Sequence, residues 1–285
     1  MTDGKKIGFI GQGWIGKNYA DDFENRGYAV IRYALEEPYA QNKEKIKDCD
    51  IVFIAVPTPT TSEGFSDAIV RQAVGLVGTG KIAVIKSTII PGTTESIQAD
   101  YADVFVMHAP EFLVERTAAF DAANPQRNIV GIPVVNDLYR QKAEEVLAVL
   151  PEAPFKLITK AKDAELVKYG GNVFLYFKVI YANILHDLSS ALGCDWENVR
   201  DSVAADPRIG TSHMQPIHQS GRGAGGDCFI KDFEAFYRLH RDQVGDELTL
   251  KALEAIRERN IDLLLKSEKD LGLLKGVYGE EVVKK

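Results

Sequence analysis

Short runs rich in isoleucine and valine recur through the first half of the chain, and stretches with the composition of helices separate them. The runs lie at Lys6–Ile10, Tyr28–Tyr33, Asp50–Val56, Lys81–Lys86, Val104–Met107 and Asn128–Ile132. Strands this apolar are typical of a parallel sheet covered on both faces, and strand–helix alternation is the pattern of a doubly wound α/β domain. We therefore predict a Rossmann-like, doubly wound parallel sheet over residues 1–158, with a short second crossover between Tyr33 and Asp50.

The second half of the chain has the pattern of helices. One long helix is predicted from Ala161 to about Leu192, although it contains the Gly170–Gly171 pair, which lowers helix propensity. A Gly- and Pro-rich loop follows over residues 206–226, and the last predicted helices lie after Cys228 and from about Glu247 to Leu265. Residues 159–285 are therefore predicted to form an all-helical central domain.

Composition excludes several classes of function. The formal net charge is -7 without a dense Lys/Arg block, so a nucleic-acid partner is not expected. No apolar run approaches the roughly 18 residues of a membrane span, and the N-terminal residues do not resemble a signal peptide. The three cysteines, Cys49, Cys194 and Cys228, are too widely spaced for a zinc site or a disulfide framework. We expect a cytoplasmic protein without a metal.

The hexapeptide GQGWIG, residues Gly11 to Gly16, stands between a predicted strand and a predicted helix. In a dinucleotide site Gly11 allows the tight turn, Gly13 lets a pyrophosphate approach the backbone, and Gly16 allows the helix to pack on the strand. A plain glycine turn is the alternative. The predicted cofactor contacts of this turn are Gly11, Gln12, Gly13, Trp14, Ile15 and Gly16.

The end of the second predicted strand should present an acid to the adenosine ribose, but Arg32 and Tyr33 stand there. Arg32 could accept the 2′-phosphate of NADP, or it could be a solvated residue beside the adenine. The sequence favours NAD over NADP.

Three clusters of polar residues have spacings that suit catalysis. Cys228 begins a predicted helix, where the helix dipole favours a thiolate, and Asp232 follows one turn later; a buried structural cysteine is equally compatible. Lys168 and Asn172 are four apart on the long helix and could hold an oxyanion, or could form an exposed polar face. The third cluster follows a strand and contains two glutamates that could act as bases or simply be solvated, Glu111 and Glu115.

Taken in order along the chain, these segments resemble the UDP-glucose and GDP-mannose 6-dehydrogenase family. The matching segments are GQGWIG, VPTP (Val56–Pro59), KSTIIPGTT (Lys86–Thr94), APEFLVE (Ala109–Glu115), ELVKYGGN (Glu165–Asn172), DPRIG (Asp206–Gly210) and GGDCFIKD (Gly225–Asp232). The combination of the KYGGN and GGDCFIKD segments is specific, whereas glycine turns alone are common.

The resemblance implies an NAD-dependent oxidation of a sugar 6-hydroxyl to a carboxylate through a Cys228 thiohemiacetal and thioester. It implies that Lys168 and Asn172 stabilise oxyanions and that Asp232 orders a water. Glu111 would be the base for thioester hydrolysis, and Thr88 would hold the water.

Further implied contacts are those of the cofactor and the substrate. Thr58, Thr88 and Glu115 would line the nicotinamide side. The implied substrate contacts are Glu111, Phe112, Leu113, Lys168, Asn172, Arg208, Gly221, Gly223 and Gly225. Cys49 and Cys194 match no catalytic position and are expected to be packed structural thiols.

The resemblance also has departures and alternatives. Members of the family usually carry a third, C-terminal α/β domain over the nucleotide, whereas this sequence stops at Lys285, and its loop between Gly210 and Cys228 is a few residues longer. A non-catalytic dinucleotide-binding module and a two-electron hydroxyacid dehydrogenase are the alternatives. Because the long helix is apolar around its circumference, a homodimer is expected. The resemblance implies that Arg208 completes the partner's site and that the substrate is a UDP-sugar.

Overall fold

The computed structural model describes residues 4–219 and 221–284, and its packing divides the chain into two compact units. The first unit comprises residues 1–59 and 66–168, and the second comprises residues 60–65 and 169–285. The long helix α6 (Ala161–Ala191) begins in the first unit and continues in the second.

The first unit is built on a seven-stranded sheet with the order β2-β1-β3-β6-β7-β8-β9. Its strands are β1 (Lys6–Ile10), β2 (Ala29–Tyr33), β3 (Ile51–Ile54), β6 (Ile82–Ile85), β7 (Phe105–His108), β8 (Arg127–Ile132) and β9 (Phe155–Lys160). The first five strands are parallel, which confirms the predicted Rossmann-like domain. The all-parallel prediction is wrong at one place, because β8 pairs antiparallel with β7 through His108 and Gly131. The segment between β7 and β8, which contains α4, does not return to the end of the sheet at which β7 begins. β8 therefore begins at the end of the sheet where β7 stops and runs in the opposite direction.

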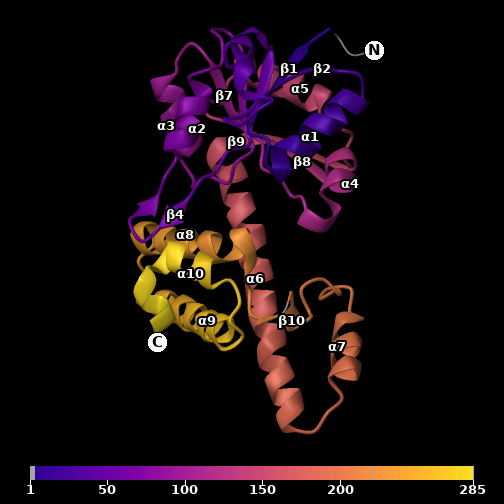
Figure 1. Cartoon of the computed structure of the whole chain (residues 1–285), viewed down its shortest axis with the longest axis vertical. Coiled ribbons are helices and arrows are strands. Elements are labelled where there is room, and N and C mark those ends of the chain that lie inside the picture. Colours follow the sequence, from indigo (N-terminus) through magenta and orange to yellow (C-terminus); the bar gives the residue numbers. More distant parts are fainter. Residues whose placement is uncertain (1–3, 220, 285) are drawn as a thin grey trace. The chain divides into compact units, whose positions relative to one another are not determined.

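Helices connect the strands of this sheet (Figure 1). They are α1 (Trp14–Asn25), α2 (Ala68–Val74), α3 (Thr93–Asp100), α4 (Ala118–Ala123) and α5 (Asp137–Val149), with the short 3₁₀ segment η2 (Glu115–Thr117) before α4. The short second crossover predicted from the sequence is confirmed as a 3₁₀ segment, η1 (Ala40–Asp48).

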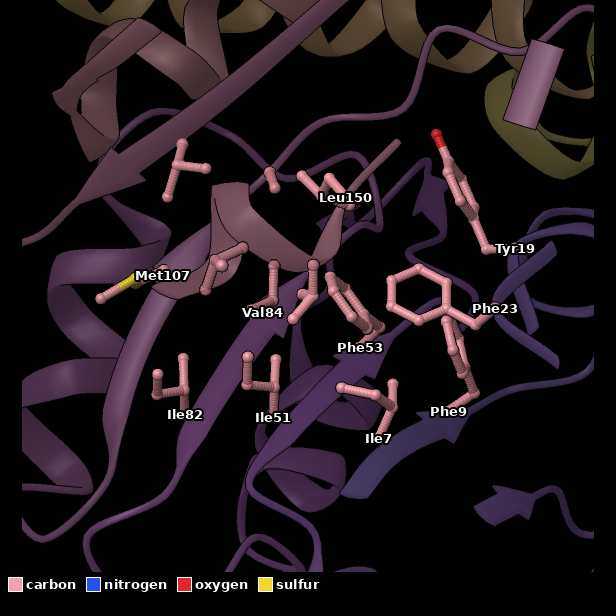
Figure 2. Packing of buried hydrophobic residues seen from close by; sticks show 14 of the residues in the cluster. Ile7, Phe9, Tyr19, Phe23, Ile51, Phe53, Ile82, Val84, Met107 and Leu150 are labelled. Carbon is pink, nitrogen blue, oxygen red and sulfur yellow. The ribbon is translucent and has the colours of Figure 1, made fainter. Parts of the chain in front are cut away.

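The core of the first unit forms where alternate residues of neighbouring strands point to the same face (Figure 2). Phe9 of β1 stacks on Phe53 of β3 with ring centroids 5.1 Å apart, and Phe23 of α1 meets Phe9 edge-on at 5.3 Å. All three rings are buried, so they attach α1 to β1, which leads into the glycine turn, and to the neighbouring strand β3.

The second unit is mainly helical. Besides α6 it contains α7 (Trp196–Ala204), α8 (Gly226–Gln243), α9 (Glu247–Lys266), α10 (Leu271–Tyr278) and the 3₁₀ segment η3 (Glu280–Lys284). The small strands β10 (Ile217–His218) and β11 (Gly221–Arg222) form one antiparallel pair, and β4 (Thr60–Thr61) and β5 (Gly64–Phe65) form another. Helices α8, α9 and α10 pack together (Figure 1). The sequence reading missed α7 and α10, which have only nine and eight residues, too few for a clear helical period.

The apolar circumference predicted for α6 divides into two stripes. One stripe, Val173, Tyr176 and Ile180, is buried in the core of the second unit, where Tyr176 stacks on Phe233 at 4.1 Å. The other stripe consists of Phe174, Tyr181, Ile184 and Leu188, and about half or more of each residue is exposed. In the described part of the chain, no helix is both long and apolar enough to cross a membrane.

Candidate active site

The glycine turn between β1 and α1 has the geometry predicted for it. Gly11 has a φ of +90°, and a Cβ there would lie 2.1 Å from the Ala55 carbonyl oxygen. A Cβ at Gly16 would lie 2.0 Å from the Gly11 carbonyl oxygen, whereas one at Gly13 would meet no atom of the described residues within 4 Å. Gly11 and Gly16 are therefore required by packing, while Gly13 leaves space in front of the start of α1. The N-cap residue of α1 is Gly13, which has no side chain to cap the helix, so the backbone N–H groups at its start suit a phosphate.

Arg32 is held by carboxylates of the first unit. Its Nε and Nη2 atoms donate to Glu24 at 2.9 and 2.7 Å, and Nη2 also lies 2.7 Å from Asp21 Oδ1. A guanidinium paired in this way has already neutralised its charge, so binding a 2′-phosphate would require these pairs to break. This arrangement gives Arg32 a structural role. The alternative of a solvated residue is wrong, because Arg32 is buried, and its contact with the cofactor stays a prediction.

We expect Arg32→Ala to change NAD affinity by less than about threefold, because Arg32 is committed to Glu24 and Asp21. NAD should be preferred over NADP both before and after the substitution. Isothermal titration with both cofactors measures this. A wild-type protein that binds NADP more tightly than NAD would contradict it.

The carboxyl ends of β3 and β6 are joined by hydroxyl groups. Thr58 Oγ1 donates to the Thr88 carbonyl at 2.7 Å, which brings together two residues that the resemblance assigned to the nicotinamide side. Ser87 Oγ, which the sequence reading missed, accepts from Val56 N at 2.9 Å and donates to Val56 O at 2.7 Å. The two loops are thus fixed at the edge of the sheet where doubly wound domains bind ligands.

Glu111 and Lys168 form a buried ion pair that the sequence reading did not anticipate. Lys168 Nζ lies 2.6 Å from Glu111 Oε1 and donates to the Glu111 carbonyl at 2.9 Å. The other carboxylate oxygen accepts from Leu113 N at 2.8 Å. Both side chains are almost fully buried. The pair therefore fixes the EFLVE segment, and with it Phe112, whose ring lies 3.7 Å from Arg127 Cζ. Glu115 is exposed and begins η2.

Glu165, one turn before Lys168, was also missed. Its buried carboxylate accepts from Gly92 N at 2.6 Å, from Thr94 N at 2.8 Å and from the Thr94 hydroxyl at 2.6 Å. Gly92 is the N-cap residue of α3. Glu165 therefore joins the KSTIIPGTT segment to α6, because a carboxylate at a helix N-terminus satisfies N–H groups that have no partner within the helix.

Lys86 is a second buried cation near Glu111. Its ammonium donates to the Ala109 carbonyl at 3.1 Å and lies 4.4 Å from the centre of the Tyr19 ring. Burial lowers the pKa of Lys86 to about 8, Glu111 opposes the shift and Lys168 adds to it. Burial also lowers the pKa of His108 to about 3, so this imidazole is neutral. The buried position of Lys86 could have been predicted from the sequence, because Lys86 directly follows the apolar residues of the run KIAVIK (Lys81–Lys86).

A lysine whose pKa is lowered on folding destabilises the folded state once it is protonated. That contribution is absent above the unfolded-state pKa of 10.5 and develops as the pH falls towards 8. We therefore expect Lys86→Met to gain about 3 kcal/mol of unfolding free energy relative to the wild type between pH 10.5 and pH 8. Urea denaturation across this range measures the difference. Lys17→Met, at an exposed position, is the control, and an equal pH dependence in both variants would refute the expectation.

In the second unit, Cys228 is the third residue of α8, whose N-cap is Gly225, and its side chain is half-buried. One turn later, the buried Asp232 accepts from Asn172 Nδ2 at 2.6 Å. Lys231 also contacts the Asp232 carboxylate. The predicted placement of Cys228 and Asp232 on one helix start is thus present, and Asn172 of α6 is joined to it.

The glycines of the preceding loop are required by the packing of the second unit. A Cβ at Gly221 would lie 2.8 Å from Lys269 Cβ, and one at Gly225 would lie 2.0 Å from Asp270 Oδ2. Gly223 has a φ of +92°. Packing is a sufficient reason for these glycines, so their contact with a substrate stays a prediction.

Of three further residues considered in the sequence, Arg208 and Cys194 lie at the surface and Cys49 is buried. Arg208 is highly exposed and pairs with Asp206, with Nη2 2.6 Å from Oδ2. Cys49 is buried as expected, and burial, followed by Asp48 and Asp50, raises the pKa of its thiol to about 11. The expectation that Cys194 is packed is wrong: it is exposed, because it follows Gly193 in the turn that ends α6.

The sheet order, the glycine turn and the open start of α1 define the first unit as a dinucleotide-binding domain. Comparison with known families identifies it further. Residues 34–148 match the NAD binding domain of the UDP-glucose/GDP-mannose dehydrogenase family, and residues 162–261 match the central domain of the same family. The chain belongs to this family, and its cofactor is NAD.

Individual relatives agree with this assignment. The chain is 33% identical to the UDP-glucose 6-dehydrogenase of Pseudomonas aeruginosa over 79% of its own length, and spans 52% of that protein. It is 28% identical to the UDP-glucose 6-dehydrogenase AglM of Haloferax volcanii, covering 91% of this chain and 72% of the relative. The structure of a UDP-glucose dehydrogenase from Pyrobaculum islandicum matches 96% of this chain and 72% of its own, with a TM-score of 0.77 and 27% identity. The chain thus spans about half the length of the Pseudomonas relative.

Proposed function

We propose that this chain carries the catalytic residues of an NAD-dependent nucleotide-sugar 6-dehydrogenase, which oxidises a sugar 6-hydroxyl to a carboxylate through Cys228. The observation that carries the proposal is the start of α8, where a half-buried thiol stands one turn before a buried carboxylate held by Asn172. A non-catalytic dinucleotide-binding module would have no use for this arrangement. A two-electron hydroxyacid dehydrogenase would not need the thiol.

The proposed chemistry of Cys228 is covalent catalysis. NAD, held at the glycine turn, would supply the hydride acceptor for both oxidations. After the first oxidation, the Cys228 thiol adds to the aldehyde carbon and gives a thiohemiacetal. Loss of a hydride and a proton from this adduct gives a thioester, and water then releases the carboxylate and regenerates the thiol. Cys228 divides a difficult conversion into easier steps.

The remaining catalytic roles follow from charge and hydrogen-bonding capacity. Lys168 and Asn172, four residues apart on α6, are proposed to donate to the oxyanions that develop on the sugar oxygen. Asp232 accepts from Asn172 and is proposed to order a water. Glu111 is proposed to take a proton from the hydrolytic water, and Lys168 compensates the charge of its carboxylate. Thr88 is proposed to hold that water.

The proposed substrate is a UDP-sugar, since the Pseudomonas and Haloferax relatives are named for UDP-glucose. The segment Glu111–Leu113, Arg208 and the glycine loop 221–225 are its proposed contacts. Glu115 is proposed to face the nicotinamide, together with Thr58.

The test of this function is the amount of NADH formed per sugar consumed. The protein is incubated with NAD and a panel of UDP- and GDP-sugars, and the NADH absorbance and the acid product are quantified. Two NADH per sugar support the proposed route. One NADH per sugar, with the oxidation stopping at a carbonyl, would support an ordinary two-electron dehydrogenase, and absence of turnover with every sugar would support a binding module.

We also propose that the exposed stripe of α6 is buried in a homodimer, in which Arg208 completes the partner's site. Phe174, Tyr181 and Leu188 recur every seven residues, with Ile184 between them, and such a continuous apolar stripe is unusual on a monomer. We expect Ile184→Glu to convert a dimer into a monomer by burying an unpaired charge at the interface. Light scattering measures the mass, with the exposed Lys251→Glu as the control. A wild-type monomer would contradict the proposal.

A further inference from the structure

The loop that precedes Cys228 is held by three side chains near the C-terminal end of the second unit. We propose that Asn260, Lys269 and Asp270 are positioning residues that set the place of the Cys228 thiol by fixing the backbone of residues 223–226. The proposal rests on the proposed role of Cys228 as the nucleophile. Lys269 and Asp270 lie beyond the residues that match the family's central domain.

Asn260 of α9 binds both backbone groups of one loop residue. Its Oδ1 accepts from Ala224 N at 2.7 Å, and its Nδ2 donates to Ala224 O at 3.0 Å. Asn260 is 1% exposed, so water does not replace these bonds. A side-chain amide presents a donor and an acceptor side by side, which matches the C=O and N–H groups of one backbone residue. Asn260 therefore fixes Ala224 in the way that a neighbouring strand would.

The turn between α9 and α10 holds the two residues that flank Ala224 and Gly225. Lys269 Nζ, which is buried, donates to the Gly223 carbonyl at 3.1 Å. Asp270 Oδ2 accepts from Gly226 N at 2.8 Å. Asp270 has a φ of +55°, a left-handed conformation that aspartate tolerates better than most residues. This conformation accompanies the approach of its carboxylate to Gly225, where a Cβ would lie 2.0 Å from Oδ2.

The last of these contacts holds Gly226, two residues before Cys228. Gly226 is the first residue of α8, and Cys228 is the third. The position and direction of the first helical turn therefore depend on where the Gly226 N–H is held. Because the same loop has glycines at 221, 223 and 225, its own backbone does little to restrict it. The side chains from α9 and from the following turn supply the restriction that the glycines lack.

In a reaction with two oxidations, a mispositioned thiol should slow the second oxidation and leave the first unaffected. The first oxidation does not use the sulfur, whereas the second requires its addition to the aldehyde. Misplacement of a reacting group by about 1 Å costs on the order of a hundredfold in rate. The aldehyde then leaves before the thiol adds, and the amount of NADH formed per sugar falls below two.

The experiment compares Asp270→Ala, which removes the acceptor, with Asp270→Asn, which keeps an oxygen for Gly226 N–H. Both are made in a Cys194→Ser background, so that the exposed Cys194 does not consume reagent. The readouts are NADH per sugar with UDP-glucose, kcat, the KM for NAD, and the rate of Cys228 alkylation by iodoacetamide followed by mass spectrometry. Glu268→Gln, an exposed carboxylate in the same turn, is the matched control.

We expect Asp270→Ala to lower NADH per sugar from two towards one, to lower acid formation on the order of a hundredfold, and to leave the KM for NAD within about twofold. Asp270→Asn and Glu268→Gln should keep two NADH per sugar. Asn260→Leu should behave as Asp270→Ala does; should it fail to fold, the Asp270 pair decides. Two NADH per sugar with Asp270→Ala would overturn the inference. An equal loss of acid formation in Asp270→Asn and Asp270→Ala would also overturn it.

The alkylation rate separates this inference from the proposed function. A change of Cys228 alkylation in Asp270→Ala, but not in Asp270→Asn, supports the positioning of the thiol even when no sugar is turned over. An unchanged alkylation rate in both variants would overturn it. Failure of Cys228→Ser to affect acid formation would instead overturn the proposed function and leave the alkylation result intact.

Discussion

Replacement of Cys228 by serine is expected to reduce acid formation from the sugar by at least about a thousandfold, because a hydroxyl is a much poorer nucleophile and leaving group than a thiol at neutral pH. The first oxidation does not involve the sulfur and should persist as a slow, reversible step. Stopped assays that quantify both NADH and the uronic acid measure the two steps separately. Acid formation at the wild-type rate in Cys228→Ser would refute the proposed mechanism.

The other two cysteines provide matched controls for this experiment. Cys194→Ser should retain full activity, since Cys194 lies exposed after the end of α6. Cys49 is buried, and the raised pKa of its thiol, about 11, protects it from alkylation at neutral pH. Iodoacetamide should therefore inactivate the Cys194→Ser protein through Cys228 alone, and bound substrate should slow the inactivation.

Breaking the Lys168–Glu111 pair is expected to have the largest effect on stability. Either Lys168→Met or Glu111→Gln leaves one buried charge without its partner, which costs about 3–5 kcal/mol of unfolding free energy. The double variant removes both charges and should recover more than half of that loss. Urea denaturation of the four proteins gives the coupling free energy.

Activity should follow a different pattern from stability in the same four proteins. All three variants are expected to lose acid formation, since the proposed mechanism needs both the ammonium and the carboxylate. A double variant that recovers both stability and activity would show that the pair has a structural role alone. Stability losses that simply add in the double variant would contradict the ion pair itself.

Much of the fold follows from local sequence patterns. The six apolar runs of the first half correspond to β1, β2, β3, β6, β7 and β8, with bounds that differ by only a few residues, because each run is short, apolar and bounded by polar segments. The predicted long helix and the helix from Glu247 agree with α6 and α9 nearly to the residue. The antiparallel direction of β8 could not be predicted, because the apolar pattern of a strand is the same whether its neighbour runs parallel or antiparallel to it.

For the candidate site, the sequence by itself determined which residue types are available and how they are spaced along each helix. The turn at Gly11 and Gly16, the pairing of Cys228 with the start of α8, and the position of Asp232 one turn later all depend on local geometry, so their pattern could be read directly. The order of the motifs also determined the family.

Only the tertiary structure decided which of these groups meet. Lys168 was predicted to face an oxyanion, yet its partner within the first unit is Glu111, 57 positions away in the chain. Three side chains accept hydrogen bonds from backbone N–H groups that are distant in the sequence: Glu165, Asn260 and Asp270. No local sequence pattern predicts such contacts. Hydrogen bonds and ion pairs depend on distances of a few ångströms between segments far apart in sequence, and those distances are set by the packing of whole helices and strands.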